Sequence, residues 1–231
     1  MIVHVAKRCL YSSSLSDVFV ATDSKEIEQV VLEWGGKVIM TSSNHQSGTD
    51  RIAEAAHSID ADIVVNVQGD EALVNPLHID NVVQMMLDNP SVKVGILVNE
   101  FKKKNSPGDI KVVLNQNSEV MYFSRNDIPS SHRSEIPEML KAYHVVPFKK
   151  DFLIEYASWK PTKLELLEFN EYLRILENGE KIKALKVESA AISVDTEDDL
   201  IKVRNDMKED SLFLTYSKEK KGNFLRNNKI K

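Results

Sequence analysis

Short apolar runs alternate with amphipathic stretches along the first hundred residues. The apolar runs are rich in β-branched residues and end at polar ones, which is typical of buried strands in a parallel sheet. The stretches between them repeat apolar positions every three or four residues, which predicts helices. Strands are expected at residues 17–21, 37–40, 63–67 and 92–98, and helices at 1–10, 24–34, 50–58 and 76–89. This alternation predicts an α/β fold with a doubly wound, mostly parallel sheet.

The pattern changes after about residue 100. The expected elements are a hairpin at 111–123, a loop at 126–140, strands at 142–148 and 182–187, and helices at 149–158, 162–178 and 195–208. This mixed order predicts a small β-rich and helical subdomain in addition to the main sheet. Residues 209–231 include many lysines and asparagines near their end, and we expect them to form a flexible tail.

A polar turn follows the apolar run at residues 63–67. It contains Gln68, Gly69, Asp70 and Glu71. In open α/β sheets, ligands bind just beyond the carboxyl ends of the strands, and a glycine there lets the backbone approach a ligand closely. Asp70 is therefore placed where a hard cation or a phosphate-bound Mg²⁺ could be held. An acidic turn that caps the next helix explains the same residues equally well.

Composition excludes several classes of function. The chain of 231 residues has a formal net charge of −5, which argues against nucleic acid as the main partner. Its single cysteine, Cys9, excludes an internal disulfide framework. No apolar run is long enough to span a membrane, and the first residues do not resemble a signal peptide. We therefore expect a cytoplasmic protein without membrane or nucleic-acid partners.

Four separated motifs resemble one family when taken in order. They are His45–Arg51 (HQSGTDR), Gln68–Glu71 (QGDE), Tyr122–Arg125 (YFSR) and Val194–Leu200 (VDTEDDL). The set resembles the 3-deoxy-manno-octulosonate (Kdo) cytidylyltransferases, which make CMP-Kdo from CTP and a 2-keto-3-deoxy sugar acid. The resemblance implies a Rossmann-like nucleotidyltransferase fold over residues 1–208. Residues 1–100 would form the nucleotide-binding half, and residues 101–190 the sugar-binding and dimerisation part.

The resemblance assigns the nucleotide site to the first motif. The residues concerned are Gln46, Ser47, Gly48, Thr49 and Arg51. Backbone N–H groups and hydroxyls at a helix start suit a nucleobase or a phosphate, although an ordinary capped loop would look the same. Asp70 and Asp195 are the expected catalytic pair, because two carboxylates at strand ends can share Mg²⁺. The alternative for Asp195 is a helix cap.

The resemblance assigns sugar binding to Gln68, Arg125, His144 and Glu171. Arg125 could pair bidentately with the sugar carboxylate, although a surface ion pair is the simpler explanation. His144 lies two residues from the histidine position of the family. Glu171 is expected within the helix at 162–178, where it could accept hydrogen bonds from sugar hydroxyls. The leucines of residues 164–176 resemble the dimer-side helix of the family, so we expect a homodimer.

The sequence departs from the family in two places. It starts just after the strand and basic glycine loop that grip the triphosphate in the family. In addition, Ala142 and Val146 occupy the histidine and tyrosine positions of the family's sugar-binding strand. The first departure leaves open a catalytically inactive homologue that dimerises or binds a sugar. A nucleotidyltransferase for another base and sugar is a further, weaker alternative.

Overall fold

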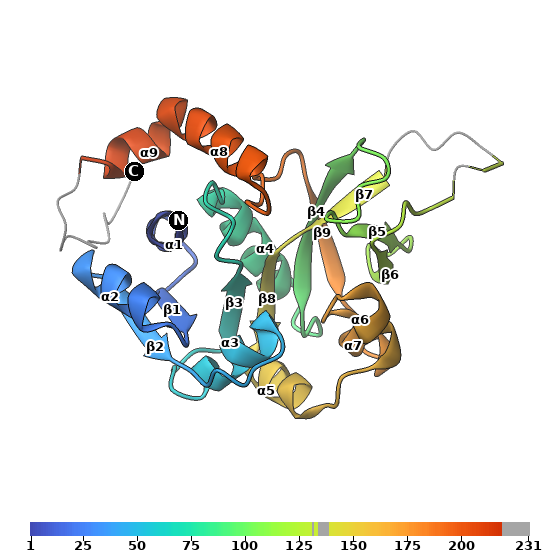
Figure 1. The fold of residues 1–231 in the computed structure, drawn as a ribbon. Coiled ribbons are helices and arrows are strands. Elements are labelled where there is room, and N and C mark those ends of the chain that lie inside the picture. The colour runs from blue at the N-terminus through green and yellow to red at the C-terminus, as the bar shows by residue number, and fades with distance from the viewer. Residues whose placement is uncertain (131, 134–138, 219–231) are drawn as a thin grey trace. The chain divides into compact units, whose positions relative to one another are not determined.

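The computed structural model describes residues 1–130, 132–133 and 139–218, and it has an α/β fold (Figure 1). Its helices are α1 (Ile2–Cys9), α2 (Lys25–Glu33), α3 (Gly48–Ala56), α4 (Pro76–Asp88), α5 (Lys150–Ser158), α6 (Lys163–Glu168), α7 (Leu173–Glu177), α8 (Glu197–Glu209) and α9 (Ser211–Tyr216). Its strands are β1 (Phe19–Thr22), β2 (Lys37–Met40), β3 (Ile63–Val67), β4 (Gly95–Phe101), β5 (Lys111–Leu114), β6 (Val120–Ser124), β7 (Met139–Tyr143), β8 (Val145–Lys149) and β9 (Lys183–Val187). None of the helices in the described ranges is both long and apolar enough to cross a membrane.

The chain divides into two compact units that interleave along the sequence. The first unit contains residues 1–55, 67–81 and 191–231, and the second contains residues 56–66 and 82–190. Residues 1–100, which we predicted as one half, therefore contribute to both units. Residues 101–190 lie wholly in the second. The boundary differs because the chain crosses between the units three times before residue 100.

The first unit begins with helix α1 and the parallel strand pair β1–β2, with α2 between the strands. Helix α2 starts where predicted, because the Ser24 hydroxyl accepts a hydrogen bond from the Ile27 N–H (3.3 Å). It ends at Glu33, and Gly35 just beyond the C-cap has a φ of +84°, a conformation that favours glycine. Ala6, Val20 and Val31 pack together between these elements as a small apolar core.

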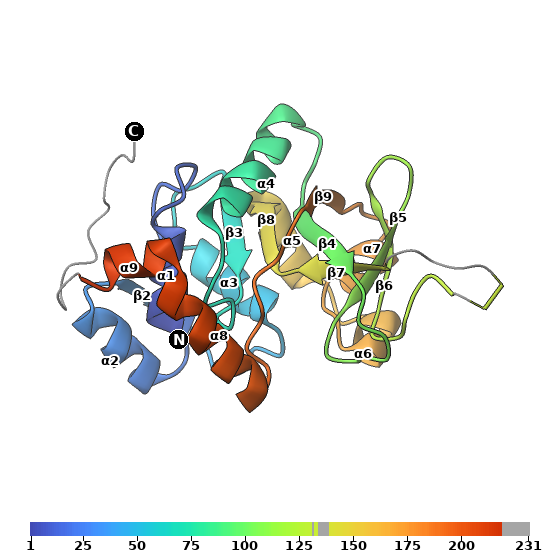
Figure 2. The ribbon, with the colours of Figure 1, turned by 90° about the horizontal axis from the view of Figure 1, so that it is seen from above.

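The C-terminal helices α8 and α9 also belong to the first unit. Helix α9 lies beside α1 (Figure 2), and His4 Nδ1 lies 3.2 Å from the Tyr216 hydroxyl. Tyr216 is only 2% exposed. The prediction of a flexible tail from residue 209 is therefore wrong for residues 211–216, which form a packed helix. The aromatic residues Phe213 and Tyr216 make this packing possible. The remainder of the predicted tail, residues 219–231, lies outside the described residues.

The second unit is built on a five-stranded sheet in the order β6-β5-β7-β4-β9. Strands β4 and β9 are parallel, whereas the β4–β7, β5–β6 and β5–β7 pairs are antiparallel. The fully buried residues Ile96, Leu97, Val98 and Phe123 lie on its strands. The predicted hairpin at 111–123 is confirmed as β5 and β6. Its antiparallel pairing is what makes this part of the fold the expected β-rich subdomain.

Two expected elements are each divided in the structure. The apolar run at 142–148 was predicted as one strand, but it contributes to β7 and β8, which meet at His144. Strand β7 pairs with β4 and β5, whereas β8 pairs with β3, so the chain changes sheets at this point. The predicted helix at 162–178 is interrupted at Phe169, which has a left-handed backbone (φ 48°). Helices α6 and α7 replace it.

Candidate functional site

Arg51 connects the carboxyl ends of the parallel strands β1 and β2. Its Nη1 atom donates to Thr41 Oγ1 (2.7 Å) and to the Ser42 carbonyl (3.3 Å), just beyond β2. The same atom lies 3.2 Å from Asp23 Oδ1, just beyond β1. Ligands in open α/β sheets bind at this edge. Arg51 therefore places a positive charge where the sequence predicted part of the nucleotide site.

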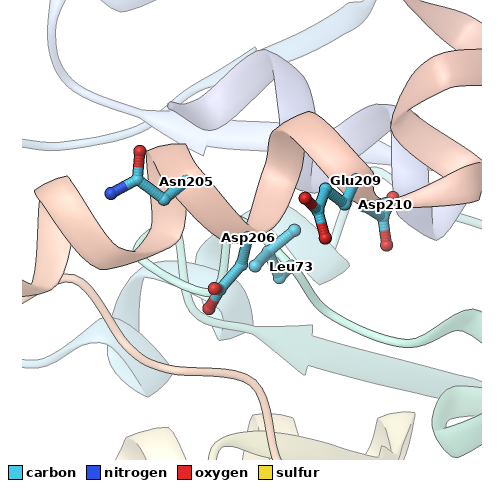
Figure 3. Close-up of a pocket in the computed structure, with 5 residues that line it drawn as sticks. All are labelled: Leu73, Asn205, Asp206, Glu209 and Asp210. Atoms are coloured by element: carbon cyan, nitrogen blue, oxygen red, sulfur yellow. The ribbon is translucent and has the colours of Figure 1, made fainter.

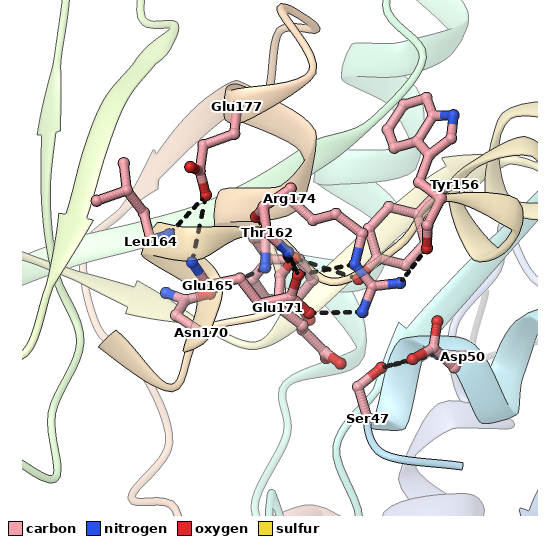
Figure 4. Close-up of polar contacts among 12 residues, drawn as sticks. Ser47, Asp50, Tyr156, Thr162, Leu164, Glu165, Asn170, Glu171, Arg174 and Glu177 are labelled. Carbon is pink, nitrogen blue, oxygen red and sulfur yellow. Dashed lines mark hydrogen bonds and ion pairs between the residues drawn. The ribbon is translucent and has the colours of Figure 1, made fainter. Parts of the chain in front are cut away.

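The other predicted nucleotide residues lie at the start of α3. The Ser47 hydroxyl accepts a hydrogen bond from the Asp50 N–H (3.1 Å) and donates to the Asp50 carboxylate (2.7 Å; Figure 4). Gly48 is the first residue of the helix, and the exposed Gln46 amide donates to the Asn44 carbonyl (3.2 Å). Thr49 is fully buried, so its side chain is not exposed at this helix start. The contacts between Ser47 and Asp50 are those of an ordinary capped helix start, which was the alternative explanation for this motif.

The segments that carry Asp70 and Asp195 are hydrogen-bonded to each other. The Val194 N–H donates to the Asp70 carbonyl (3.2 Å). The residue before Val194 and the residue after Asp70 are also connected, because the Ser193 hydroxyl donates to Glu71 Oε1 (2.7 Å). Gln68 belongs to the same turn, because its carbonyl accepts from the Glu71 N–H (3.2 Å). The structure thus brings together two segments that lie more than a hundred residues apart in the sequence.

Asp195 does not cap α8, which was the alternative explanation for it. The N-cap is Thr196, whose hydroxyl accepts from the Asp199 N–H (3.2 Å). The Asp199 carboxylate accepts in return from the Thr196 N–H (3.0 Å), which completes a capping box. The Asp195 carboxylate is exposed and is not required for the cap. Capping of α8 therefore does not account for Asp195.

Arg125 lies in the second unit and binds backbone carbonyls. Its Nε, Nη1 and Nη2 atoms donate to the carbonyls of Glu168 (2.8 Å), Pro107 (2.8 Å) and Phe169 (3.1 Å). Two of these carbonyls belong to the C-terminal end of α6, which a cation stabilises. The alternative explanation for Arg125 was a surface ion pair. The structure instead shows its guanidinium bound to carbonyls at the end of α6. A guanidinium has five N–H groups, so two remain for a carboxylate.

His144 lies at the break between β7 and β8, and its ring stacks on Tyr172 with centroids 6.1 Å apart. Removal of the ring from water, with a smaller contribution from the charges of Lys141 and Arg125, lowers the pKa of His144 to about 4. The ring is therefore neutral at pH 7. A neutral imidazole can donate one hydrogen bond and accept another, which suits a sugar hydroxyl.

The lowered pKa of His144 predicts how stability changes with pH. The unfolded chain binds a proton at this residue below about pH 6.5, whereas the folded chain does so only near pH 4. The free energy of unfolding should therefore fall as the pH decreases from about 6.5 to about 4. Urea unfolding at pH 7 and pH 5 should show a smaller loss for His144→Gln than for the unmodified chain. A His144 ring that titrates near pH 6.5 by NMR would contradict this.

Glu171 lies in the turn between α6 and α7 rather than within a helix, which corrects the sequence prediction. The helix ends earlier because of the left-handed backbone at Phe169. The Glu171 carbonyl accepts from the Tyr156 hydroxyl (3.1 Å) and from the Arg174 N–H (3.2 Å). Figure 4 shows these residues with the Arg174–Glu165 ion pair, which is buried beside them. The backbone carbonyl of Glu171 thus helps to hold the turn in place.

The sequence did not single out Glu71 and Ser193, which contact each other beside the two predicted carboxylates. Glu71 is only 1% exposed. The sequence offers one signal for these two residues, which is their position next to the predicted carboxylates. Glu71 directly follows Asp70, and Ser193 lies two residues before Asp195. Neither residue can be recognised without knowing that the two segments meet.

A cavity of about 460 Å³ in the first unit is lined by Leu73, Asn205, Asp206, Glu209 and Asp210 (Figure 3). Three of the lining residues are acidic. One of them, Asp210, forms an ion pair with Arg8 at 2.7 Å. Carboxylates repel phosphate groups. The cavity therefore does not fit a nucleoside triphosphate.

Comparison with known proteins identifies the family. The cytidylyltransferase family model matches residues 1–182. The 3-deoxy-manno-octulosonate cytidylyltransferase of Trichlorobacter lovleyi is 40% identical over 223 residues, which cover 90% of this chain and 88% of that protein. The chain belongs to the 3-deoxy-manno-octulosonate cytidylyltransferase family. The Escherichia coli enzyme of that name is 36% identical over 206 residues and is covered to 84%.

Solved structures agree with membership of the 3-deoxy-manno-octulosonate cytidylyltransferases. A structure of CMP:2-keto-3-deoxy-manno-octonic acid synthetase complexed with CTP is 36% identical and superposes with a TM-score of 0.85. The match covers 90% of this chain and 87% of that one. A putative glucose-1-phosphate thymidylyltransferase from Bacillus anthracis, 14% identical with a TM-score of 0.63, shares the fold alone. The predicted Rossmann-like nucleotidyltransferase fold is thereby confirmed.

Proposed function

We propose that the chain transfers a cytidylyl group from CTP to Kdo, giving CMP-Kdo and pyrophosphate. The observation that carries the proposal is the match, over nine-tenths of the chain, to the CMP:2-keto-3-deoxy-manno-octonic acid synthetase complexed with CTP. Arg51, the start of α3 and the Asp70–Asp195 pair also lie in one unit. The breadth of the match and the presence of both carboxylates favour a working enzyme over an inactive remnant.

We propose Asp70 and Asp195 as ligands of Mg²⁺. Mg²⁺ is usually held by one or two carboxylates together with substrate phosphates and water. The hydrogen-bonded segments of Asp70 and Asp195 supply such a pair. Among the described residues, no group of three or more His, Cys, Asp or Glu side chains could hold a metal by itself. When bound, Mg²⁺ would neutralise charge on the triphosphate.

The remaining residues bind and orient the substrates. The anomeric hydroxyl of the sugar attacks the α-phosphorus. Pyrophosphate leaves as the bond breaks between the α-phosphorus and the oxygen that bridges it to the β-phosphorus. No protein nucleophile is needed, since positioning and charge stabilisation account for catalysis of such transfers. Arg51 and the amide groups that begin α3 would bind the nucleotide. The sugar acid would contact Gln68, Arg125, His144 and Glu171, with the two remaining guanidinium N–H groups of Arg125 on its carboxylate.

An assay of the purified chain tests this proposal. We expect pyrophosphate release that requires CTP, Kdo and Mg²⁺ together. A coupled phosphate assay measures this release. UTP in place of CTP serves as the control for the base and should give no release. Equal release from UTP would assign the chain to another base, and no release from either nucleotide would overturn the proposal.

We also propose that the chain forms a homodimer through the surface around α6. Leu166, Leu167 and Phe169 are 62%, 65% and 79% exposed, an unusual concentration of apolar side chains within four residues. We expect Leu167→Glu to lower the sedimentation coefficient from that of a dimer to that of a monomer. Leu77→Glu, at a similarly exposed leucine of α4, should leave it unchanged. A monomeric unmodified chain at micromolar concentration would contradict the proposal.

A further inference from the structure

We infer that Ser193 is a positioning residue for the Asp70–Asp195 pair, an inference that rests on the metal site proposed above. Ser193 does not belong to any of the four motifs. Its hydroxyl nevertheless makes a side-chain contact between the segment that carries Asp195 and the segment that carries Asp70. The inference concerns the distance and orientation between two carboxylates rather than a new ligand of the ion.

The two segments are joined at two neighbouring points. The bond from the Val194 N–H to the Asp70 carbonyl (3.2 Å) connects the backbones. The bond from the Ser193 hydroxyl to Glu71 Oε1 (2.7 Å) connects the residue before Val194 to the residue after Asp70. A single hydrogen bond leaves two segments able to pivot about it, whereas two adjacent bonds fix their relative orientation. Asp70 and Asp195 lie within one residue of these bonds.

Burial makes the second bond the stronger constraint. Glu71 is 1% exposed, so its carboxylate cannot exchange the serine for bulk water at little cost. The distance of 2.7 Å is that of a well-formed hydrogen bond from a hydroxyl to an oxygen atom. Ser193 is thus held to a fixed, buried anchor.

Electrostatics explains why the pair needs such a constraint. Two carboxylates that share one cation repel each other before the cation arrives. Without a second connection, the segments could separate and would have to be drawn together when the ion binds. The bond from Ser193 holds the two segments in place before the ion binds. Less of the free energy of ion binding is then lost in ordering these segments. Groups that orient metal ligands in this way typically change metal affinity 10- to 100-fold when removed.

Manganese binding separates positioning from simple stability. Mn²⁺ replaces Mg²⁺ as the probe, and free Mn²⁺ is measured by electron paramagnetic resonance with the full chain and CTP, without sugar acid. We expect Ser193→Ala to weaken Mn²⁺ binding about tenfold, while Ser193→Thr, which keeps the hydroxyl, stays within about threefold of the unmodified chain. The thermal midpoint is recorded for each variant.

Ser12→Ala is the matched control. Ser12 also donates its hydroxyl to a carboxylate, that of Asp80, in the same unit. Its loss should change stability to a similar extent and leave Mn²⁺ affinity unchanged. If Ser193→Ala lowers the thermal midpoint without weakening Mn²⁺ binding, the residue is structural and the inference is wrong.

Asp195→Asn distinguishes the failure of this inference from the failure of the metal site. If Asp195→Asn weakens Mn²⁺ binding and Ser193→Ala does not, the metal pair stands and the positioning role is overturned. If Asp195→Asn has no effect, the proposed metal pair is wrong, and the role of Ser193 fails with it. Weakening by both variants, with rescue by Ser193→Thr, supports the inference.

Discussion

Asp70→Asn should lower the rate of cytidylyl transfer by a factor on the order of 10²–10³. The substitution keeps the size of the side chain and the Asp70 carbonyl that accepts from Val194, but it removes one of the two charges proposed to hold Mg²⁺. A bound metal supplies several kcal/mol of charge stabilisation in such reactions, and each ~1.4 kcal/mol corresponds to a tenfold change in rate. Pyrophosphate release at saturating CTP and Kdo measures the effect.

Asp206→Asn provides the control for Asp70→Asn. Asp206 is an exposed carboxylate on α8 that lines the acidic cavity of the same unit. The same change from carboxylate to amide there should leave the rate within twofold of the unmodified chain. Full activity of Asp70→Asn would show that this carboxylate does not take part in the reaction. Equal losses from both variants would point to a general effect of charge.

Arg174→Met should destabilise the second unit by about 3–5 kcal/mol. The Arg174 Nη2 and Nε atoms donate to both carboxylate oxygens of Glu165, at 2.5 and 2.9 Å. Arg174 is 2% exposed, and its guanidinium also lies over the Tyr156 ring, 4.5 Å from the centroid. Methionine has a similar length but leaves the Glu165 carboxylate buried beside an apolar group. The free energy of unfolding in urea measures this loss.

Two further variants test the cause of that loss. Adding Glu165→Gln to Arg174→Met removes the buried charge but keeps an acceptor for the Thr162 N–H, which Glu165 binds at 2.9 Å. The double variant should therefore recover part of the stability. Lys25→Met breaks the exposed Lys25–Glu28 pair and should change stability by less than about 1 kcal/mol. A similar loss from Lys25→Met and Arg174→Met would contradict the importance of burial.

The regular elements could be predicted wherever local signals agreed. Ser24 and Gly35 define the two ends of α2, and Pro76 begins α4, as residues of these types do in general. The division at Phe169 could not be predicted, because phenylalanine rarely adopts a left-handed backbone. The change of sheets at His144 could not be predicted either. An apolar run does not reveal which strands will pair with each part of it.

Candidate site residues could be proposed where they follow strands and motifs, but the contacts between those residues could not. Asp70 and Asp195 were proposed from the turn after β3 and from the VDTEDDL motif. That Thr196 rather than Asp195 caps α8 depends on a difference of one residue at a helix start. The contact between Glu71 and Ser193 depends on tertiary structure. Arg125 was expected to face a ligand, whereas three of its nitrogen atoms bind carbonyls that only the fold brings near.

The interleaving of the two units bears on how the chain folds during synthesis. The second unit is complete once residue 190 has emerged from the ribosome, whereas the first unit still lacks residues 191–216. Those residues include Asp210 and Tyr216, which contact Arg8 and His4 of the first helix. Domains usually complete folding from the N-terminus onward. Helix α1 is made before most of the second unit but gains these partners only after it, so a nascent chain whose residue 190 has just emerged would carry a finished second unit and an unfinished first one.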